Sequence, residues 1–225
     1  MSLLRPVPRT TRSAAVTGDN PLAPEIYRQA YVGLTLPNDV TPVVIGVTSA
    51  ISGEGRTTVA IGLARTLAED LDMPVSLVEV DLDRPSLTAQ FDIASAPGLC
   101  EVLRGEYRLD EVLRPVSDNL SVATAGNNGP DSARLMRQIP DLDPFHGDSG
   151  LQGIVILDLP PIINHSYAAL AAGVADAIIL VVRAAVTPHD IVREAIARLE
   201  DHAPQGVIFN GPRTVLPRWW PGRNI

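Results

Sequence analysis

A glycine-rich segment between an apolar run and an amphipathic run is the part of this sequence best suited to chemistry. The apolar, β-branched run VVIGVT leads into residues 49–58 (SAISGEGRTT), where a helical pattern begins. Glycines at positions 53 and 55 let the backbone wrap closely, so that its N–H groups can face phosphate oxygens at a helix N-terminus. Arg56 offers a cation to those phosphates, and the Thr57 hydroxyl offers a ligand to Mg²⁺. The segment therefore predicts a phosphate-binding loop.

This loop departs from the usual G-x-x-x-x-G-K-[ST] pattern at two of its four fixed positions. Gly55 and Thr57 match, whereas Ala50 stands for the first glycine and Arg56 for the lysine. A guanidinium is planar and bulkier than an ammonium, so Arg56 favours phosphate binding over efficient phosphoryl transfer. The alternative is a glycine turn that caps a helix with a threonine and binds no ligand.

Acidic residues follow two later apolar runs. The run VSLVEV (75–80) leads to Glu79 and Asp81, and the run IVILD ends in Asp158, just before two prolines. A carboxylate at the end of a buried strand needs a cation or hydrogen-bond donors, and Mg²⁺ held with Thr57 and nucleotide phosphates would supply the cation. The alternatives are a solvated loop after the first run and a turn cap at Asp158. Because ligands of parallel sheets bind beyond the carboxyl ends of the strands, we expect these acids beside the loop.

Apolar runs and amphipathic runs alternate along most of the chain. Strands are expected over 43–48, 75–80, 120–126, 153–159, 176–182 and 206–210, and helices over 57–71, 98–106, 109–116, 132–139 and 187–201. The strands are continuously apolar, which is typical of a parallel sheet that is buried on both faces. The predicted fold class is α/β, a mostly parallel sheet with helices on both faces.

Composition restricts the class of protein further. The chain has 225 residues, of which 45% are hydrophobic, so it can bury a full core as one domain over 23–212. Its formal charge of −8 speaks against a nucleic-acid partner. Cys100 is the single cysteine, which excludes an internal disulfide or a cysteine-based zinc site and fits a reducing cytoplasm. No apolar run reaches the roughly 18 residues of a membrane-spanning helix.

The two ends of the chain differ in composition from the middle. Residues 1–22 are rich in Pro, Thr and Arg, and they are expected to form a flexible basic tail. Residues 213–225 form a basic-aromatic tail in which arginines flank Trp219 and Trp220. That composition suits a membrane interface or a partner groove. The alternative is that both tryptophans fold back over apolar surface of the domain.

Several blocks together resemble one family of proteins. They are APEIYRQAY, VTSAISGEGRTT, SLVEVDLDRPSL, GLCEVLRGE, LSVATAGNNGPDSARLM, IVILDLPP, VVRAAVTPHD and GVIFN. In order and spacing, over about residues 21–212, they resemble the cytoplasmic P-loop domain of bacterial tyrosine autokinases (BY-kinases). These kinases work with membrane co-polymerases in capsule and exopolysaccharide synthesis. The wider group has the SIMIBI-like P-loop NTPase architecture and includes the Min/Par-type partitioning ATPases.

The resemblance implies a role for each matching position, with ATP or ADP and Mg²⁺ as cofactors. The nucleotide-binding residues would be Ser52, Gly53, Glu54, Gly55, Arg56, Thr57 and Thr58, with Asn210 near the adenine. The catalytic residues would be Arg56, Glu79, Asp81 and Asp158. Thr57 would bind Mg²⁺, and Asp81 and Asp158 would support the shell of the ion. Glu79 stands where the family has an aspartate that contacts the acceptor hydroxyl.

Other positions bear on assembly and on the acceptor. Glu25 and Arg28 match the family's subunit-contact motif E-x-x-R-x-x-R and imply a homo-oligomer, but Tyr31 replaces the last arginine. All 18 basic residues of the chain are arginine, so the loop lysine is missing together with every other lysine. The C-terminal tyrosine cluster that the family phosphorylates is also missing.

These departures leave three functions open. One is a degenerate binding module, with reduced or no kinase activity, that binds Mg-nucleotide weakly and regulates a membrane co-polymerase. Another is an active ATP-dependent tyrosine autokinase or ATPase, and the third is a partitioning ATPase. Arg56, Glu79 and the tyrosine-poor tail favour the first. We expect a cytoplasmic protein that lies peripherally at the inner face of the plasma membrane.

Truncation after residue 212 tests the role of the C-terminal tail. We expect it to abolish recruitment to membrane vesicles or to the co-polymerase's cytoplasmic segment, because Trp219 and Trp220 would supply the interfacial contact. Recruitment is measured by co-sedimentation, and circular dichroism checks that the fold is kept. Recruitment that survives the deletion would contradict the tail as the contact.

Overall fold

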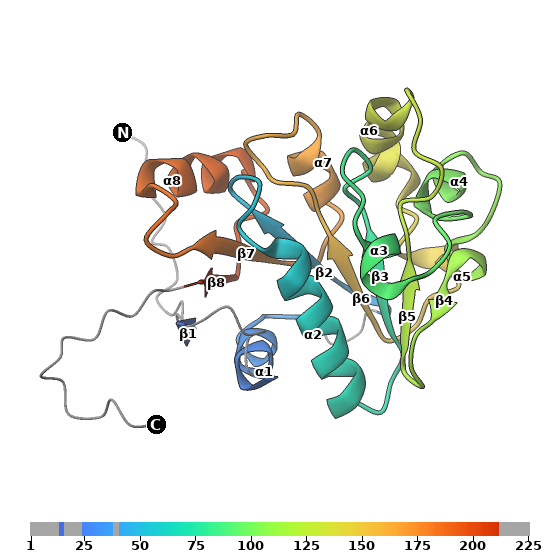
Figure 1. Ribbon diagram of the computed structural model, residues 1–225, viewed down its shortest axis with the longest axis horizontal. Helices are drawn as coiled ribbons and strands as arrows, with labels where there is room; N and C mark the ends of the chain where they lie inside the picture. Colours follow the sequence, from blue (N-terminus) through green and yellow to red (C-terminus); the bar gives the residue numbers. More distant parts are fainter. Residues whose placement is uncertain (1–13, 16–23, 38–40, 212–225) are drawn as a thin grey trace, which may run out of the picture.

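An eight-stranded sheet organises the chain, in a computed structural model that describes residues 14–15, 24–37 and 41–211 (Figure 1). The strand order is β1-β8-β7-β2-β6-β3-β5-β4. The strands are β1 (Ala14–Ala15), β2 (Val43–Ser49), β3 (Val75–Glu79), β4 (Arg114–Pro115), β5 (Leu120–Ala123), β6 (Ile154–Asp158), β7 (Ala177–Arg183) and β8 (Gly206–Asn210). All neighbours are parallel except β4 and β5. The predicted α/β class with a mostly parallel sheet is confirmed.

Helices cover both faces of this sheet. They are α1 (Pro24–Val32), α2 (Arg56–Asp70), α3 (Leu87–Phe91), α4 (Leu99–Leu103), α5 (Leu109–Val112), α6 (Ser132–Leu142), α7 (Ala168–Ala172) and α8 (His189–Arg198), with a 3₁₀ turn at Gly147–Ser149. Side chains alternate along each strand, so Ile45 and Val47 of β2 pack in one apolar cluster with α1, α2 and α3, and Val44 packs in another with α4 to α8. Figure 1 shows α1 and α2 lying across the near face. The continuous apolar strands thus serve two cores.

Helix α1 is fixed to α2 by a buried tyrosine and an ion pair. Tyr27 is 2% exposed and lies over Gly62, where any side chain would collide with the phenol ring. Arg28 of α1 donates to both carboxylate oxygens of Asp70 on α2, at 2.5 and 2.8 Å, and lies 3.7 Å from Glu25. Arg28, expected at a subunit contact, therefore already has an acidic partner within its own chain.

The expected tails lie almost wholly outside the described residues. The C-terminal tail with Trp219 and Trp220 is outside them, and so is most of residues 1–22. Ala14 and Ala15, which belong to that N-terminal segment, form β1 and pair in parallel with Ile208 and Phe209 of β8. Within the described part of the chain, no helix is long and apolar enough to cross a bilayer.

The strand order brings the ends of β2, β6 and β3 together. Asp158 of β6 pairs in register with Val47 of β2 on one side and with Glu79 of β3 on the other. Register partners on neighbouring parallel strands point to the same face, so Asp158 and Glu79 lie side by side on the face that carries α2. The segment between β2 and α2 begins directly beside them.

His146 links two elements on the α6 side of the sheet. Its Nδ1 lies 2.9 Å from Asp143 Oδ1, and its Nε2 lies 3.4 Å from Asp176 Oδ2, which also accepts the N–H of Val44. Burial lowers the pKa of His146, but the hydrogen bonds and charges of Asp143 and Asp176 outweigh it, so that the pKa is raised above 6.5. The ring therefore joins the end of α6 to the start of β7, and the two carboxylates favour its protonated form.

Replacement of His146 is expected to make stability less dependent on pH. A raised pKa in the folded state stabilises the fold fully below the unfolded value of about 6.5, and this stabilisation is lost as pH rises through the folded value. The His146→Asn variant should be less stable than the unaltered protein by up to about 1 kcal/mol at pH 6, with the gap closing by pH 8.5. Thermal melts from pH 5.5 to 8.5 measure it, with His189→Asn as the exposed control. A gap that does not change with pH would contradict this role.

Candidate phosphate-binding site

The loop between β2 and α2 has the backbone shape that phosphate binding needs. Gly53 and Gly55 both take the left-handed conformation, with φ of 83° and 87°. A side chain at position 55 would also collide with the Asn210 amide, whereas the space above Gly53 is open. Glycine is thus required at position 55 both by its φ and by the close approach of Asn210.

The N-terminus of α2 has no side-chain cap. Its cap residue is Gly55, and no side chain caps the helix with a hydrogen bond. The first backbone N–H groups of a helix have no acceptor within the helix, and the helix dipole is positive there. In a helix of 15 residues, these N–H groups and the glycine turn together favour a phosphate group.

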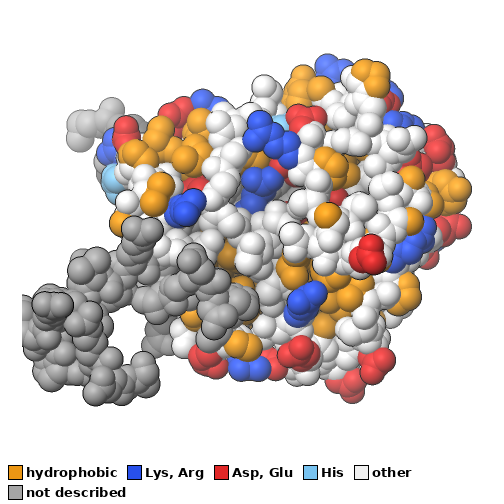
Figure 2. Space-filling view, in the orientation of Figure 1, with side chains coloured by type: hydrophobic (Ala, Val, Ile, Leu, Met, Phe, Trp, Pro, Cys, Tyr) orange, Lys and Arg blue, Asp and Glu red, His pale blue; other side chains and the backbone are white. Residues whose placement is uncertain are grey.

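Arg56, at the lysine position, contacts both acids that follow the neighbouring strands. Its Nη2 forms an ion pair with Asp81, and its Nε lies 3.8 Å from Asp158 Oδ1. The three side chains are only 12%, 4% and 1% exposed. Figure 2 shows basic side chains at this edge of the sheet, and all of them are arginines because the chain contains no lysine. Arg56 therefore neutralises carboxylates that the sequence assigned to a metal shell.

Asp158 is the most strongly perturbed acid at this edge. Burial raises its pKa to about 7, and the charges of Glu79 and Asp81 add to the rise, while Arg56 and the Thr57 hydroxyl oppose it. Its Oδ1 is buried without a hydrogen-bond partner among the described residues. A buried carboxylate oxygen without a donor, next to a threonine hydroxyl, fits the shell of a Mg²⁺ ion that carries nucleotide phosphates. Thr57 and Asp158 would hold that ion, and it would neutralise phosphate charge.

Glu79 is fully buried and has no exposed carboxylate oxygen. Its Oε1 accepts the backbone N–H groups of Ser86 and Leu87, and its Oε2 accepts that of Ala125 at 3.1 Å. Burial raises the pKa of Glu79, and these three N–H groups lower it in part. The side chain joins the segment after β3 to the end of β5, so an acceptor hydroxyl does not reach it in this arrangement.

The remaining predicted loop residues surround the glycine turn. Thr58 is exposed in the first turn of α2, and Ser52 lies 3.4 Å from an Arg84 nitrogen. Glu54 is buried, with its carboxylate turned away from solvent. Asn210, expected near an adenine, donates its amide N–H to the Glu54 carbonyl at 2.9 Å. The structure thus brings every predicted nucleotide residue to one edge of the sheet.

Two side chains after β6 complete this edge, and neither was predicted from the sequence. Asn164 accepts the backbone N–H of Ser52 at 2.9 Å, and His165 Nε2 lies 2.9 Å from Asp83 Oδ2. They brace the phosphate loop and the segment after β3, respectively. Both residues follow Asp158 of β6 by only a few positions, which places them at the carboxyl edge of the sheet. That spacing could have identified them from the sequence.

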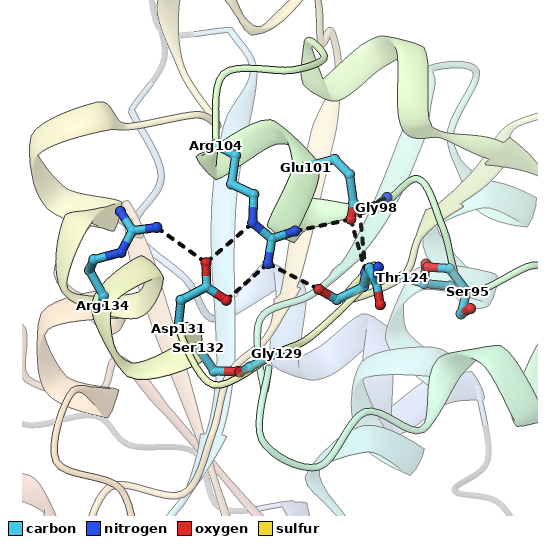
Figure 3. Close-up of polar contacts among 10 residues, drawn as sticks. Ser95, Gly98, Glu101, Arg104, Thr124, Gly129, Asp131, Ser132 and Arg134 are labelled. Carbon is cyan, nitrogen blue, oxygen red and sulfur yellow. Dashed lines mark hydrogen bonds and ion pairs between the residues drawn. The ribbon is translucent and has the colours of Figure 1, made fainter.

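A second polar network lies around the loop between β5 and α6 (Figure 3). Arg104, directly after α4, contacts Glu101 at 3.2 Å and Asp131 at 3.0 Å, and this holds the loop between β5 and α6. From that loop, Asn128 donates to the Leu82 carbonyl at 2.8 Å. The segment that carries Asp81 is therefore held by Asn128 as well as by Glu79.

The strand, glycine turn and helix have the geometry of the P-loop NTPase architecture, and sequence relatives narrow the class. No family model matches the chain. It is 28% identical over 171 residues to the tyrosine-protein kinase YwqD of Bacillus subtilis, covering 74% of this chain and 71% of that kinase. It is also 28% identical over 176 residues to the tyrosine-protein kinase etk of Escherichia coli, covering 75% of this chain and 23% of that kinase. The chain thus spans most of the first relative and less than a quarter of the second.

Solved structures agree with these relatives. The kinase domain of the E. coli kinase ETK matches with a TM-score of 0.70 at 25% identity, over 89% of this chain and 80% of that domain. The septum site-determining protein MinD of Pyrococcus horikoshii, complexed with Mg-ADP, matches in fold with a TM-score of 0.60 at 19% identity, over 73% of this chain and 67% of MinD. The relatives of this chain are bacterial tyrosine-protein kinases, and the predicted resemblance is confirmed.

Removal of the Asp158 charge is expected to stabilise the ligand-free protein at neutral pH. The carboxyl has a pKa of about 7 when folded and about 3.8 when unfolded, so the folded state binds more protons between these values. Stability therefore falls as pH rises from 4 to 7, by on the order of a few kcal/mol. The Asp158→Asn variant should lack this fall.

Urea titrations between pH 4.5 and 8 measure the difference. Asp158→Asn should be more stable than the unaltered protein at pH 8, with the advantage shrinking toward pH 4.5. Asp72→Asn, which removes an exposed carboxylate at the end of α2, is the matched control and should follow the unaltered protein. Equal pH slopes in all three proteins would show that Asp158 does not titrate in this range.

Proposed function

We propose that this chain is a BY-kinase-like P-loop protein of exopolysaccharide or capsule synthesis and export. It binds Mg-nucleotide weakly at the loop around Gly53 and Gly55, and it regulates a membrane co-polymerase with reduced or no phosphoryl transfer. The kinase relatives and the loop geometry support the nucleotide site. The co-polymerase and the place at the inner face of the plasma membrane rest on the family resemblance.

The burial of Glu79 is the observation that supports reduced or absent phosphoryl transfer. Phosphoryl transfer to a hydroxyl needs a carboxylate that can position that hydroxyl in line with the phosphate. In this chain the carboxylate accepts three backbone N–H groups and has no exposed surface. Freeing it would leave those buried N–H groups unpaired, at a cost of about 1–3 kcal/mol each.

Arg56 supports the same proposal from the phosphate side. Its guanidinium is paired with Asp81, and to reach a phosphate it must give up that ion pair. The paired residues are almost fully buried, so the exchange separates charges in a site of low dielectric. Nucleotide phosphates and their metal ion can compensate for this loss, but we expect weaker binding than an unpaired cation would give.

A lysine at position 56 should bind nucleotide more tightly. Lysine is a compact cation that a P-loop can surround, and it lacks the planar guanidinium that reaches both Asp81 and Asp158. We expect Arg56→Lys to lower the Kd for MgATP and MgADP by about tenfold, or about 1.4 kcal/mol. Calorimetric titration of both proteins measures this, with Arg65→Lys on the exposed side of α2 as the control.

Phosphotyrosine is assayed in the same samples, with the co-polymerase's cytoplasmic segment added as acceptor. The unaltered protein should give none. Micromolar binding of MgATP together with tyrosine phosphorylation by the unaltered protein would replace this proposal with the active autokinase. Absence of binding in both the unaltered and the Arg56→Lys protein would remove the nucleotide from the proposed function.

A further inference from the structure

Glu54 carries a buried carboxylate inside the phosphate loop itself. The residue is 2% exposed, although its neighbours Gly53 and Ser52 face solvent. Its Oε2 accepts the N–H of Ile51 in the same loop at 2.8 Å. An ionised side chain in such a place must be compensated by donors from elsewhere in the chain.

Those donors come from the loop between β7 and α8. Oε1 of Glu54 accepts the backbone N–H of Arg183 at 2.9 Å and the hydroxyl of Thr187 at 2.5 Å. Arg183 is the last residue of β7, and Thr187 lies two residues before α8. Figure 1 shows the loop after β2 beside the loop after β7, as expected for neighbouring strands. One carboxylate therefore joins two loops that are 129 residues or more apart in the sequence.

The backbone carbonyl of Glu54 also links the phosphate loop to the ends of β7 and β8. Its carbonyl accepts the Asn210 amide, and Asn210 in turn accepts the N–H of Ala184 through its own carbonyl at 3.0 Å. The last residues of β7 and β8, Arg183 and Asn210, are also register partners. The phosphate loop is thus braced from the β7 and β8 side by both the side chain and the backbone of one residue.

The hydrogen bonds to the Glu54 carboxylate depend on the positions of both loops. Among the described residues, the hydrogen bonds to this carboxylate come from two backbone N–H groups and a hydroxyl, not from an arginine. Directional neutral donors compensate a buried charge only while both loops keep their positions. A shift of either loop would therefore leave the carboxylate short of donors.

We infer that Glu54 is a positioning residue for the proposed nucleotide site. It holds the phosphate loop in its binding shape before the ligand arrives, and it links the loop 184–188 to occupancy of the phosphate loop. This inference rests on the proposed nucleotide binding. A loop that is ordered beforehand loses less entropy on binding, which increases affinity.

The test uses Glu54→Gln and Thr187→Val, which change the bond between the two loops from either side. Each variant should raise the Kd for MgADP about tenfold, measured by calorimetry on the full chain. In the double variant the loss should be clearly smaller than the product of the two single losses, because both substitutions remove the same interaction. Glu194→Gln, an exposed carboxylate on α8, is the matched control and should bind like the unaltered protein.

Amide hydrogen exchange supplies a readout that general destabilisation would not move. In the unaltered protein, MgADP should slow exchange at residues 184–188, and in Thr187→Val this response should be lost while thermal melts show a folded protein. Normal affinity and a normal exchange response in Thr187→Val would overturn the inference and leave the proposed function intact. Independent, fully multiplicative losses in the double variant would also overturn it. Absence of MgADP binding by the unaltered protein would overturn both.

Discussion

Two carboxylates buried side by side at the end of β6 and β3 set the main constraint on this molecule. Asp158 and Glu79 are register partners on one face of the sheet, and both are almost inaccessible to water. Like charges this close cannot both persist without compensation. The chain compensates Glu79 with three backbone N–H groups, whereas Asp158 has only the Arg56 Nε at 3.8 Å and keeps a raised pKa.

Much of the surrounding structure follows from this compensation. The N–H groups that satisfy Glu79 belong to the segment after β3 and to the end of β5, so both are held against the sheet. Arg56, in the first turn of α2 and directly after the glycine turn, contacts both Asp81 and Asp158. Asn164, in the loop after β6, holds the phosphate loop, and Asn128 holds the segment after β3. The result is an edge in which the Arg56 guanidinium lies between Asp81 and Asp158.

The elements with strong local patterns could be predicted from the sequence. The continuous apolar strands and the long α2 appear where expected, and the acid of β6 lies beside the phosphate loop because the order of parallel strands leaves few other arrangements. The five-residue helices α3 and α7 were missed, since so few residues carry no helical period. The burial of Glu79 depends on donors from Ser86 and Ala125, and such tertiary partners leave no local trace. The brace by Thr187 on Glu54 is of the same kind.

The order of the strands also governs when the site can exist during synthesis. β2 is synthesised before its two neighbours in the sheet, β6 and β7. Val43 can pair only after Ile154 has been synthesised, and Ile45 only after Ala177 has been synthesised. Until β6 and β7 have been synthesised, the strand before the glycine turn has no neighbours, and α2 has no complete face of the sheet to cover. Contacts this far apart in the sequence form slowly, because a long loop must close first. The nascent chain therefore carries its phosphate loop without its neighbouring strands until β6 and β7 have been synthesised.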